Sequence, residues 1–292
     1  MLGETKTPIL QMIPDEYKPK TIYPVSGANL SQIKQLMADA GIVYPIIAKP
    51  DRGERGFMVE RITSDDELDV YIKKMTIPFI IQEFVSFKEE FAVLYYILPG
   101  ESIGRVASVT VKEFLKARGD GKSTLEALIL KNPRAIIHWE KLVKKFEHRF
   151  HEVLAEGEEL ELEPIGNHVR GTKFLDGSYL IDNQLNQVFH QITSQLNGVY
   201  YCRYDLKCTS AEDLKQGKNI RIVEVNGVGA EPAHIYDPNY KIVQAWKDIF
   251  RLWKAIYIIA RHNHNQGVPY MTTREVLNQW KLIKKYRNMQ PA

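Results

Sequence analysis

Two periods of apolar residues run through the chain, one typical of helices and one typical of strands. Between Asn29 and Ala40 the apolar residues recur every three or four positions and Gly41 follows, which predicts a helix and its end. Residues 63–75 show the same period, with Thr63 or Ser64 as the N-cap, acidic residues first and lysines last. Further helices are predicted at 124–130, 139–154, 183–196 and 240–257.

Short apolar or alternating runs predict strands between these helices. They lie at 44–50, 56–62, 79–85, 89–98, 105–114, 159–166, 200–208 and 222–227. Several are joined by short connections, so neighbouring strands are expected to be antiparallel. The mixed order of elements favours an α+β fold over a doubly wound parallel sheet.

Composition places the chain among ordinary globular proteins. It has 292 residues, of which 44% are hydrophobic and 26% charged, and a net charge of only +3 with both signs interspersed. Nucleic acid is therefore not the expected partner, whereas an anionic small molecule is compatible with this balance. The start lacks a secretion-signal pattern, and no apolar run reaches the length of a membrane span.

The two cysteines, Cys202 and Cys208, lie in one predicted strand. At a rise of roughly 3.3 Å per residue they are about 20 Å apart, so they cannot bond to each other. Free cysteines are typical of a reducing compartment, and we expect a cytoplasmic protein.

The strands at 200–208 and 222–227 carry the first candidate chemistry. Side chains alternate along a strand, so Arg203 shares a face with Asp205, and Glu224 shares one with Asn226. Antiparallel pairing brings Asp205 opposite the Glu224 and Asn226 face, where two carboxylates repel unless a cation lies between them. Two carboxylates and an amide oxygen suit Mg²⁺. A solvated hairpin face is the alternative interpretation of the same pattern.

A lysine at the end of a strand marks a second candidate site. Lys49 precedes a loop that contains Gly53 and Gly56, and glycines let backbone N–H groups approach an anion. The spacing matches neither the Walker loop nor the dinucleotide fingerprint, and a surface turn is the alternative. Gln82 and Glu83 lie near the end of the strand at 79–85, and Glu90 follows a turn. An amide and a carboxylate at these positions could serve adenine and ribose.

Taken in order, these motifs resemble the ATP-grasp superfamily and, within it, the D-alanine:D-alanine ligase group, with some likeness to the ATP-grasp part of cyanophycin synthetases. The resemblance covers about residues 4 to 240. The family pattern is a strand-end lysine with a Gly-rich loop, a hinge strand with a later glutamate, an R-x-D strand and an E-x-N strand. Here these read as Lys49 with residues 52–56, residues 82–85 with Glu90, residues 203–205, and residues 224–226.

The resemblance implies a role for each matching residue. Phosphate binding falls to Lys6, Lys49, Arg52, Gly53 and Gly56, and adenine and ribose binding to Gln82, Glu83, Val85 and Glu90. Two Mg²⁺ ions, or Mn²⁺ in their place, would be held by Asp205, Glu224 and Asn226. Arg203 would steady the acyl phosphate and the tetrahedral intermediate. In the loop at 166–174, Arg170 is favoured over His168 as a phosphate contact.

The resemblance also implies an architecture of two α+β subdomains, with mostly antiparallel sheets, that clasp ATP. We expect a lead-in at 1–45, a small subdomain at 46–100, a large subdomain at 101–240 and C-terminal helices packed on the core at 241–292. If Lys6 matches the family's first phosphate-binding lysine, the usual N-terminal lobe is missing. A partner protein or the missing lobe would then complete the substrate site.

The activity implied is that of an ATP-dependent, carbon–nitrogen bond-forming ligase that activates a carboxylate as an acyl phosphate and passes it to an amine. Its substrates would be ATP and amino acids or peptide-like molecules. A regulatory protein that keeps the nucleotide fold, and an ATP-grasp kinase that stops at phosphorylation, are the alternatives.

Three other features are given structural interpretations. His148 with His151, and the histidines of residues 262–265, lack a further ligand at metal spacing and are predicted to face solvent. Residues 119–128, GDGKSTLEAL, are predicted to be a turn and a helix cap rather than a nucleotide loop. The aromatic stripe Trp246, Phe250, Trp253 and Tyr257 is predicted to pack on the core.

Overall fold

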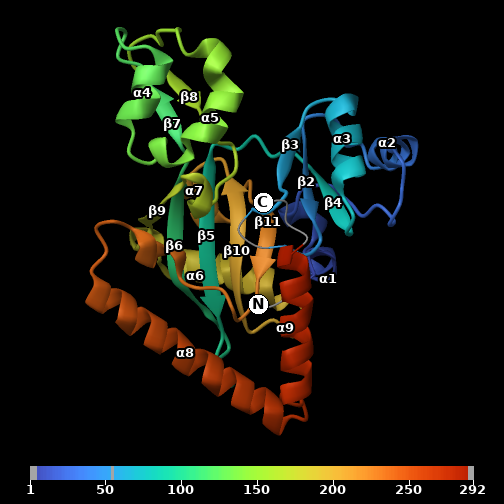
Figure 1. Cartoon of the computed structure of the whole chain (residues 1–292). Coiled ribbons are helices and arrows are strands. Elements are labelled where there is room, and N and C mark those ends of the chain that lie inside the picture. The colour runs from blue at the N-terminus through green and yellow to red at the C-terminus, as the bar shows by residue number, and fades with distance from the viewer. Residues whose placement is uncertain (1–4, 54–55, 289–292) are drawn as a thin grey trace.

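Antiparallel sheets organise the protein, as Figure 1 shows for the whole chain. The computed structural model describes residues 5–53 and 56–288, with side chains up to residue 281. A four-stranded sheet has the order β1-β4-β2-β3, a five-stranded sheet the order β11-β10-β5-β6-β9, and a ribbon pairs β7 with β8. Every described strand pairing is antiparallel, so the predicted α+β class with mostly antiparallel sheets is confirmed.

The four-stranded sheet comprises β1 (Thr21–Ile22), β2 (Ile46–Pro50), β3 (Glu60–Ile62) and β4 (Phe79–Glu83). It packs against α2 (Leu30–Asp39) and α3 (Asp65–Lys74) through a core of its own. Asn29 and Gln32 form a reciprocal capping box on α2, and Ser64 caps α3. The N-cap predicted at Thr63 or Ser64 is thus confirmed at Ser64, whereas the capping box at Asn29 was not predicted.

The five-stranded sheet comprises β5 (Glu89–Tyr96), β6 (Arg105–Glu113), β9 (Lys173–Asp176), β10 (Tyr201–Cys208) and β11 (Arg221–Asn226). One of its faces packs on α1 (Lys6–Met12), α6 (Asn183–Ser194) and α7 (Ala211–Gln216). Cys202 and Cys208 point into this core and are free, as predicted. Alternation along β10 leaves Arg203 and Asp205 on the opposite face.

A small helical unit is inserted between β6 and β9. It contains β7 (Lys116–Arg118), α4 (Leu125–Lys131), α5 (Trp139–Phe146) and β8 (Glu159–Glu161) around a separate apolar cluster. Thr124 caps α4, which confirms the turn-and-cap interpretation of GDGKSTLEAL. The helix predicted at 139–154 ends at Phe146 and continues only as a 3₁₀ turn, Glu147–Arg149. Other 3₁₀ turns span Asp15–Tyr17, Ile136–His138, His168–Arg170, Ser178–Leu180 and Ala233–Tyr236.

Two C-terminal helices, α8 (Ile242–Asn265) and α9 (Thr273–Asn288), complete the fold. The inner arc of α8 packs Leu252, Ala255 and Ile259 on the second face of the five-stranded sheet. The prediction that the aromatic stripe packs on the core is wrong, because Trp246, Phe250, Trp253 and Tyr257 are 53–63% exposed. Small residues, Ala245 and Ala255, occupy the inner arc and let the helix approach the sheet closely.

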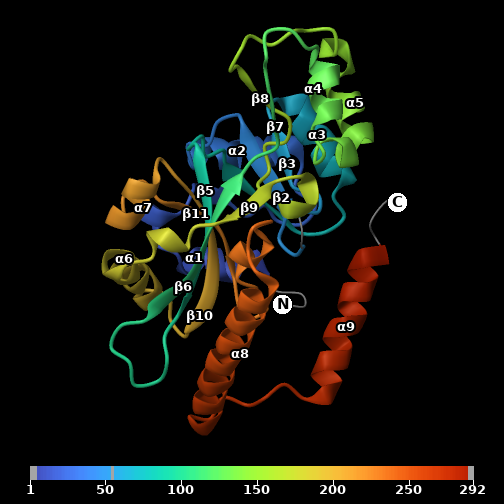
Figure 2. The same cartoon turned by 90° about the vertical axis from the view of Figure 1, so that its left-hand side faces the viewer.

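The division of the chain into a lead-in, two subdomains and C-terminal helices stays a prediction. Within residues 241–292, the described core contacts come from α8. In the view of Figure 2, α9 stands away from the sheets, and nearly every residue from Thr273 to Lys281 is exposed. Within the described part of the chain, no helix has the length and hydropathy needed to cross a membrane.

A set of hydrogen-bonded polar side chains holds α8 on the sheet. We call Ser108, His234, Tyr240, Asp248 and Arg251 the His234 cluster. Asp248 of α8 accepts hydrogen bonds from the Tyr240 hydroxyl at 2.6 Å and from Arg251 at 3.0 Å. The His234 ring lies between, with Nε2 3.4 Å from Asp248 and Nδ1 2.6 Å from the Ser108 hydroxyl of β6. Burial lowers the pKa of His234, so the ring is neutral near pH 7.

Candidate functional site

The hairpin of β10 and β11 brings the predicted metal-binding residues together. Asp205 pairs with Glu224 and Arg203 with Asn226 in the antiparallel register, as alternation along the two strands predicts. A bulge follows Asp205 and shifts the pairing for the rest of the hairpin. Asp205 is only 6% exposed, so this is not the solvated face that was the alternative interpretation.

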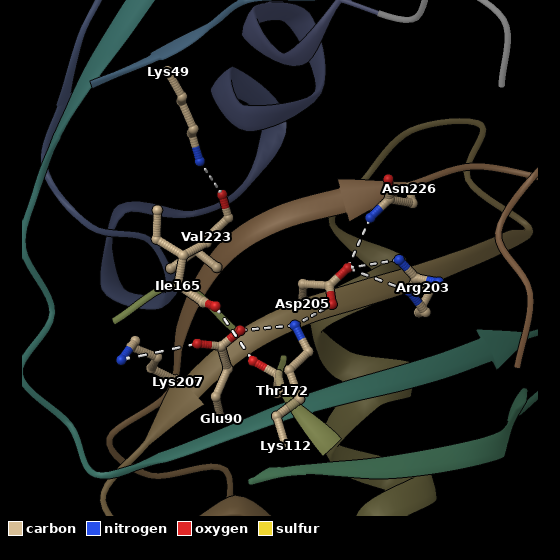
Figure 3. A network of polar contacts seen from close by, with 10 residues as sticks. All are labelled: Lys49, Glu90, Lys112, Ile165, Thr172, Arg203, Asp205, Lys207, Val223 and Asn226. Carbon is tan, nitrogen blue, oxygen red and sulfur yellow. Dashed lines mark hydrogen bonds and ion pairs between the residues drawn. The ribbon is translucent and has the colours of Figure 1, made fainter. Parts of the chain in front are cut away.

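Two cations and an amide surround the Asp205 carboxylate (Figure 3). Lys112 Nζ lies 2.7 Å from Oδ1, while Arg203 Nη2 and Asn226 Nδ2 lie 3.0 Å and 2.8 Å from Oδ2. Burial alone would raise the pKa of Asp205, but the charges of Arg203 and Lys112 outweigh it and lower the pKa to about 2. Asp205 is therefore ionised throughout the physiological range.

Lys112 joins the two carboxylates of the sheet and was missed by the sequence analysis. It lies on β6 opposite Glu90, and its Nζ is 2.7 Å from Glu90 Oε1 as well as 2.7 Å from Asp205 Oδ1. Although burial opposes the charge of Lys112, the two carboxylates raise its pKa. The available signal was a lysine near the end of a predicted strand, on the same face as Ser108 and Thr110.

Glu90, the predicted ribose ligand, is buried beneath a loop. Its Oε2 is 3.9 Å from Lys207 Nζ, a second cation that the sequence analysis did not select. A Cβ added at Gly166 would lie 2.3 Å from Glu90 Oε1. Only a glycine lets the loop approach this carboxylate so closely, because any side chain would displace one of the two groups.

Lys49 connects the two sheets. It lies at the end of β2 and is 6% exposed, and its Nζ donates to the backbone carbonyl of Val223 on β11 at 2.8 Å (Figure 3). Among the residues that the structure describes, no carboxylate lies within 4 Å of this ammonium. Burial lowers the pKa of Lys49 to about 8, only partly offset by the charge of Glu224.

The loop after β2 is held from two sides by cationic residues. Lys6 Nζ donates to the carbonyl of Gly53 at 2.9 Å and lies 3.5 Å from Glu224 Oε1. Arg170 Nη2 donates to the carbonyl of Gly56 at 2.6 Å, and Gly56 has a φ of +72° that favours glycine. Arg52 lies half-buried in this loop. Glu54 and Arg55 of the loop motif lie outside the described residues.

The predicted adenine-binding segment, residues 82–85, forms hydrogen bonds with Thr21 of β1 and with Lys20, the residue before β1. Gln82 Nε2 donates to the Thr21 hydroxyl at 3.0 Å, and Glu83 Oε1 accepts from the backbone N–H of Lys20 at 3.0 Å. Val85 follows as a buried apolar residue. The structure thus gives the Gln82 and Glu83 side chains a partner within the protein, and their contact with adenine stays a prediction.

The donor set at the hairpin fits a hard divalent cation in its chemistry. Asp205 and Glu224 face each other in register, and rotation of the Asn226 amide would present its oxygen instead of its nitrogen. Lys112 and Arg203 now neutralise Asp205, so a metal would share or replace these partners. Among the described residues no group of three His, Cys, Asp or Glu side chains could hold a metal alone. The four histidines predicted to face solvent, His148, His151, His262 and His264, are all exposed.

Positive charge exceeds negative charge among these residues, which we call the charged cluster. Five cations, Lys6, Lys49, Lys112, Arg203 and Lys207, meet three carboxylates, Glu90, Asp205 and Glu224, and Asn226 completes the set. Most of these side chains are buried or half-buried, where an unpaired charge is costly. A polyanionic ligand would remove this imbalance.

Comparison with known proteins gives a distant likeness in fold. No protein-family model and no curated protein matches the chain. The structure is similar to D-alanine–D-alanine ligase from Bacillus anthracis (12% identity, 90% of this chain and 69% of that chain, TM-score 0.49). It is also similar to VanG D-Ala:D-Ser ligase from Enterococcus faecalis (14%, 88% and 61%, TM-score 0.49).

A third similar structure is a bifunctional glutathione synthetase from Pasteurella multocida (14% identity, 85% of this chain, TM-score 0.43), of which the chain spans only 35%. The expected likeness to D-alanine:D-alanine ligases is thus found among solved structures, at the level of the fold alone. Identities this low do not transfer a substrate or an activity.

Proposed function

We propose that the protein is an ATP-dependent carboxylate–amine ligase of the ATP-grasp type, with ATP bound between its two sheets. The observation that carries the proposal is Lys49, an ammonium 6% exposed whose hydrogen bond goes to a carbonyl of the opposite sheet. Buried charges in proteins are normally paired, so this lysine indicates an anionic ligand between the sheets. The surplus of cations around it suits a triphosphate.

The surrounding residues divide naturally among the parts of ATP. Lys6 and Lys49 would bind phosphate oxygens, and the loop of Arg52, Gly53 and Gly56 would close over them. Arg170 already bonds the carbonyl of Gly56, so it would move with the loop and reach the terminal phosphate. Glu90 would accept hydrogen bonds from the ribose, next to the adenine segment of Gln82, Glu83 and Val85.

Asp205, Glu224 and Asn226 would hold Mg²⁺, or Mn²⁺ in its place. When bound, the metal would neutralise phosphate charge and align the terminal phosphate for displacement. Lys112 keeps Asp205 and Glu90 fixed at 2.7 Å from one ammonium, so the metal-binding and ribose-binding carboxylates are positioned by one cation. Lys112 itself remains positively charged because both carboxylates raise its pKa.

The chemistry then needs two displacements. A substrate carboxylate oxygen attacks the γ-phosphorus and ADP leaves, which produces an acyl phosphate. An amine next attacks the acyl carbon, phosphate leaves with the bonding electrons, and the nitrogen loses a proton to form the amide. Arg203, with its guanidinium 3.0 Å from Asp205, would stabilise the oxyanion of the tetrahedral intermediate. The acceptor would be an amino acid or a peptide-like amine.

Release of ADP and phosphate in the presence of Mg²⁺, across a panel of amino acids and peptides, tests this function. Ligation predicts that release depends on both a carboxylate and an amine, and that Glu224→Ala abolishes it. Lys122→Gln, on the exposed loop before α4, is the matched control and should leave release unchanged. Release that needs no amine would indicate a kinase, and ATP binding without turnover would indicate a regulatory protein.

A further inference from the structure

Exposed apolar side chains are concentrated on the two C-terminal helices. Within residues 242–280, thirteen large apolar side chains are exposed, against fifteen in the rest of the described chain. Trp246, Phe250, Trp253 and Tyr257 form a continuous row along α8, because their spacing of four, three and four residues keeps them on one side. On α9, Val276, Leu277 and Trp280 are 45–59% exposed.

The turn between the helices has the same character. Val268, Tyr270 and Met271 are 55–61% exposed, so the turn between α8 and α9 also presents apolar side chains to the outside. We call the exposed apolar side chains of residues 242–280 the aromatic surface. It lies on the opposite side of α8 from the arc that packs Leu252 and Ile259 on the sheet. A surface of this extent is unusual for a protein without a partner.

Basic residues flank the aromatic surface. Lys247, Lys254 and Arg261 are exposed and seven residues apart, so they form a row beside the aromatic row of α8. The sequence has only two acidic residues in this region. Asp248 is buried beside Arg251, and Glu275 accepts hydrogen bonds from Thr272 at the start of α9.

Charge is distributed unevenly between this region and the rest of the chain. Ten of the 39 lysines and arginines, but only two of the 36 aspartates and glutamates, lie in residues 241–292. The region therefore carries a net charge of +8, and residues 1–240 carry −5. A second copy docked through the same helices would place like charges opposite each other, which opposes such a dimer.

We propose that α8 and α9 bind the surface of a bilayer that contains anionic phospholipids. The basic row would contact the phosphate headgroups, and the aromatic row would enter the boundary between headgroups and acyl chains to a depth of about 5–10 Å. Tryptophan and tyrosine suit this boundary because each has an apolar ring and a hydrogen-bonding group. Both helices lie at the outer edge of the molecule (Figures 1 and 2), so the sheets do not obstruct the approach. This inference is independent of the proposed ligase activity.

Co-sedimentation of the full chain with phospholipid vesicles tests the proposal. Vesicles of phosphatidylcholine mixed with phosphatidylglycerol should bind the protein, shift its tryptophan fluorescence to shorter wavelength and release it at high salt. Vesicles of phosphatidylcholine alone should bind it at least tenfold more weakly. Equal binding to both compositions, or no binding to either, would overturn the proposal.

Two sets of substitutions separate the contributions of charge and apolar contact. The triple variant Lys247→Gln, Lys254→Gln and Arg261→Gln should weaken vesicle binding by about a hundredfold. Each lysine or arginine near an anionic surface strengthens binding by about fivefold, and the three effects multiply. Trp246→Ser with Phe250→Ser and Trp253→Ser should abolish the fluorescence shift and weaken binding at every salt concentration. All six substituted side chains are exposed and lie outside the core, so both variants should fold. Urea unfolding would verify this.

Lys122→Gln with Lys131→Gln and Lys144→Gln is the matched control, because it removes three exposed charges from the small helical unit. It should bind vesicles like the parent, and a loss equal to that of the α8 variant would contradict a specific membrane surface. Two further measurements without lipid test the alternative partners of this surface, a second copy of the chain and an acidic protein. Sedimentation velocity tests the first. A dimer that the tryptophan and phenylalanine substitutions dissociate would assign the surface to a second copy. Binding to polyglutamate that survives those substitutions would assign the basic row to an acidic protein, and either result would overturn the proposal.

Discussion

The face of the five-stranded sheet opposite α6 carries two buried polar groups, the charged cluster and the His234 cluster. Each is built around an aspartate that is 4–6% exposed, Asp205 in the first and Asp248 in the second. Asp248 receives bonds from a tyrosine and an arginine within its own region, and the cluster has no net charge. Asp205 is shared between two cations, and Lys49 nearby carries a further charge that no carboxylate of the described residues meets at ion-pair distance.

This difference separates a cluster that stabilises the fold from a candidate binding site. A buried polar network whose members are all paired stabilises one arrangement, whereas surplus buried charge is stable only with a ligand or at the expense of folding free energy. Residue types alone would mislead, because Ser108, His234 and Asp248 are those of a hydrolase triad. All three are 1–4% exposed, so a substrate cannot reach the Ser108 hydroxyl.

The largest expected effect comes from removing the charge of the site aspartate. Asp205→Asn should lower ATP-dependent turnover by about 10²–10³-fold, the range found when a preorganised charged or hydrogen-bonding group is lost from an active site. Glu90 still pairs with Lys112 at 2.7 Å, so the fold should persist. Phosphate release under saturating ATP, with urea unfolding alongside, measures both quantities. Turnover within threefold of the parent would remove Asp205 from the catalytic machinery.

The equivalent change in the His234 cluster should act on stability instead. Asp248→Asn removes the charge that holds Tyr240 and Arg251, and should lower the free energy of unfolding by about 1.5–3 kcal/mol. Turnover per folded molecule should be unchanged at low temperature. Arg251→Gln is the control. Because Arg251 is exposed, its loss should lower the free energy of unfolding by less than about 1 kcal/mol. If Asp248→Asn reduced turnover as strongly as Asp205→Asn, the two clusters would not differ in function.

The site illustrates how far the sequence predicts structure. Alternation along β10 and β11 was enough to predict which residues face each other, since strand geometry fixes faces locally. Lys112 could not be selected in the same way. Its role depends on β6 pairing with β5 at Glu90, a register set by the whole sheet, and a lysine near a strand end resembles a solvent-exposed residue.

Helix α8 illustrates a different limit. Its helical period is clear in the sequence, but apolar residues cover more than half of its circumference, so the period does not tell which arc meets the core. The sheet selects the arc with alanines because it allows close packing, and the larger aromatic side chains remain outside. The choice depends on the shape of the receiving surface, which lies far away in the sequence.

The pH dependence of nucleotide binding sharpens the comparison at Lys49. Burial lowers its pKa to about 8, so the ammonium loses its proton in an accessible range, and ATP affinity should fall about tenfold from about pH 7 to pH 9. Asp205, with a pKa of about 2, does not titrate there. Calorimetric titration with Mg²⁺ and ATP measures the effect. Lys49→Arg retains its charge and should flatten the profile, and an unchanged slope in that variant would assign the titration to another group.

The smallest expected effect is a pH dependence of stability at His234. Burial lowers the pKa of this ring in the folded protein below the value of about 6.5 in the unfolded chain, so the unfolded chain binds the proton more tightly. Stability is therefore full above about pH 6.5 and falls as the pH drops below it, by up to about 1.4 kcal/mol for each unit of pKa difference. Urea unfolding between about pH 5 and pH 7.5 should show this slope.

Other groups on the neighbouring elements also affect the His234 ring. The charges of Asp176 on β9 and Asp248 on α8 favour its protonated form, and Arg251 opposes it, so the net dependence is modest. His234→Gln should remove the part of the slope that belongs to this ring, whereas His148→Gln on the exposed 3₁₀ turn should leave it intact. A slope that persists in His234→Gln would mean that the fastening of α8 does not depend on a neutral imidazole.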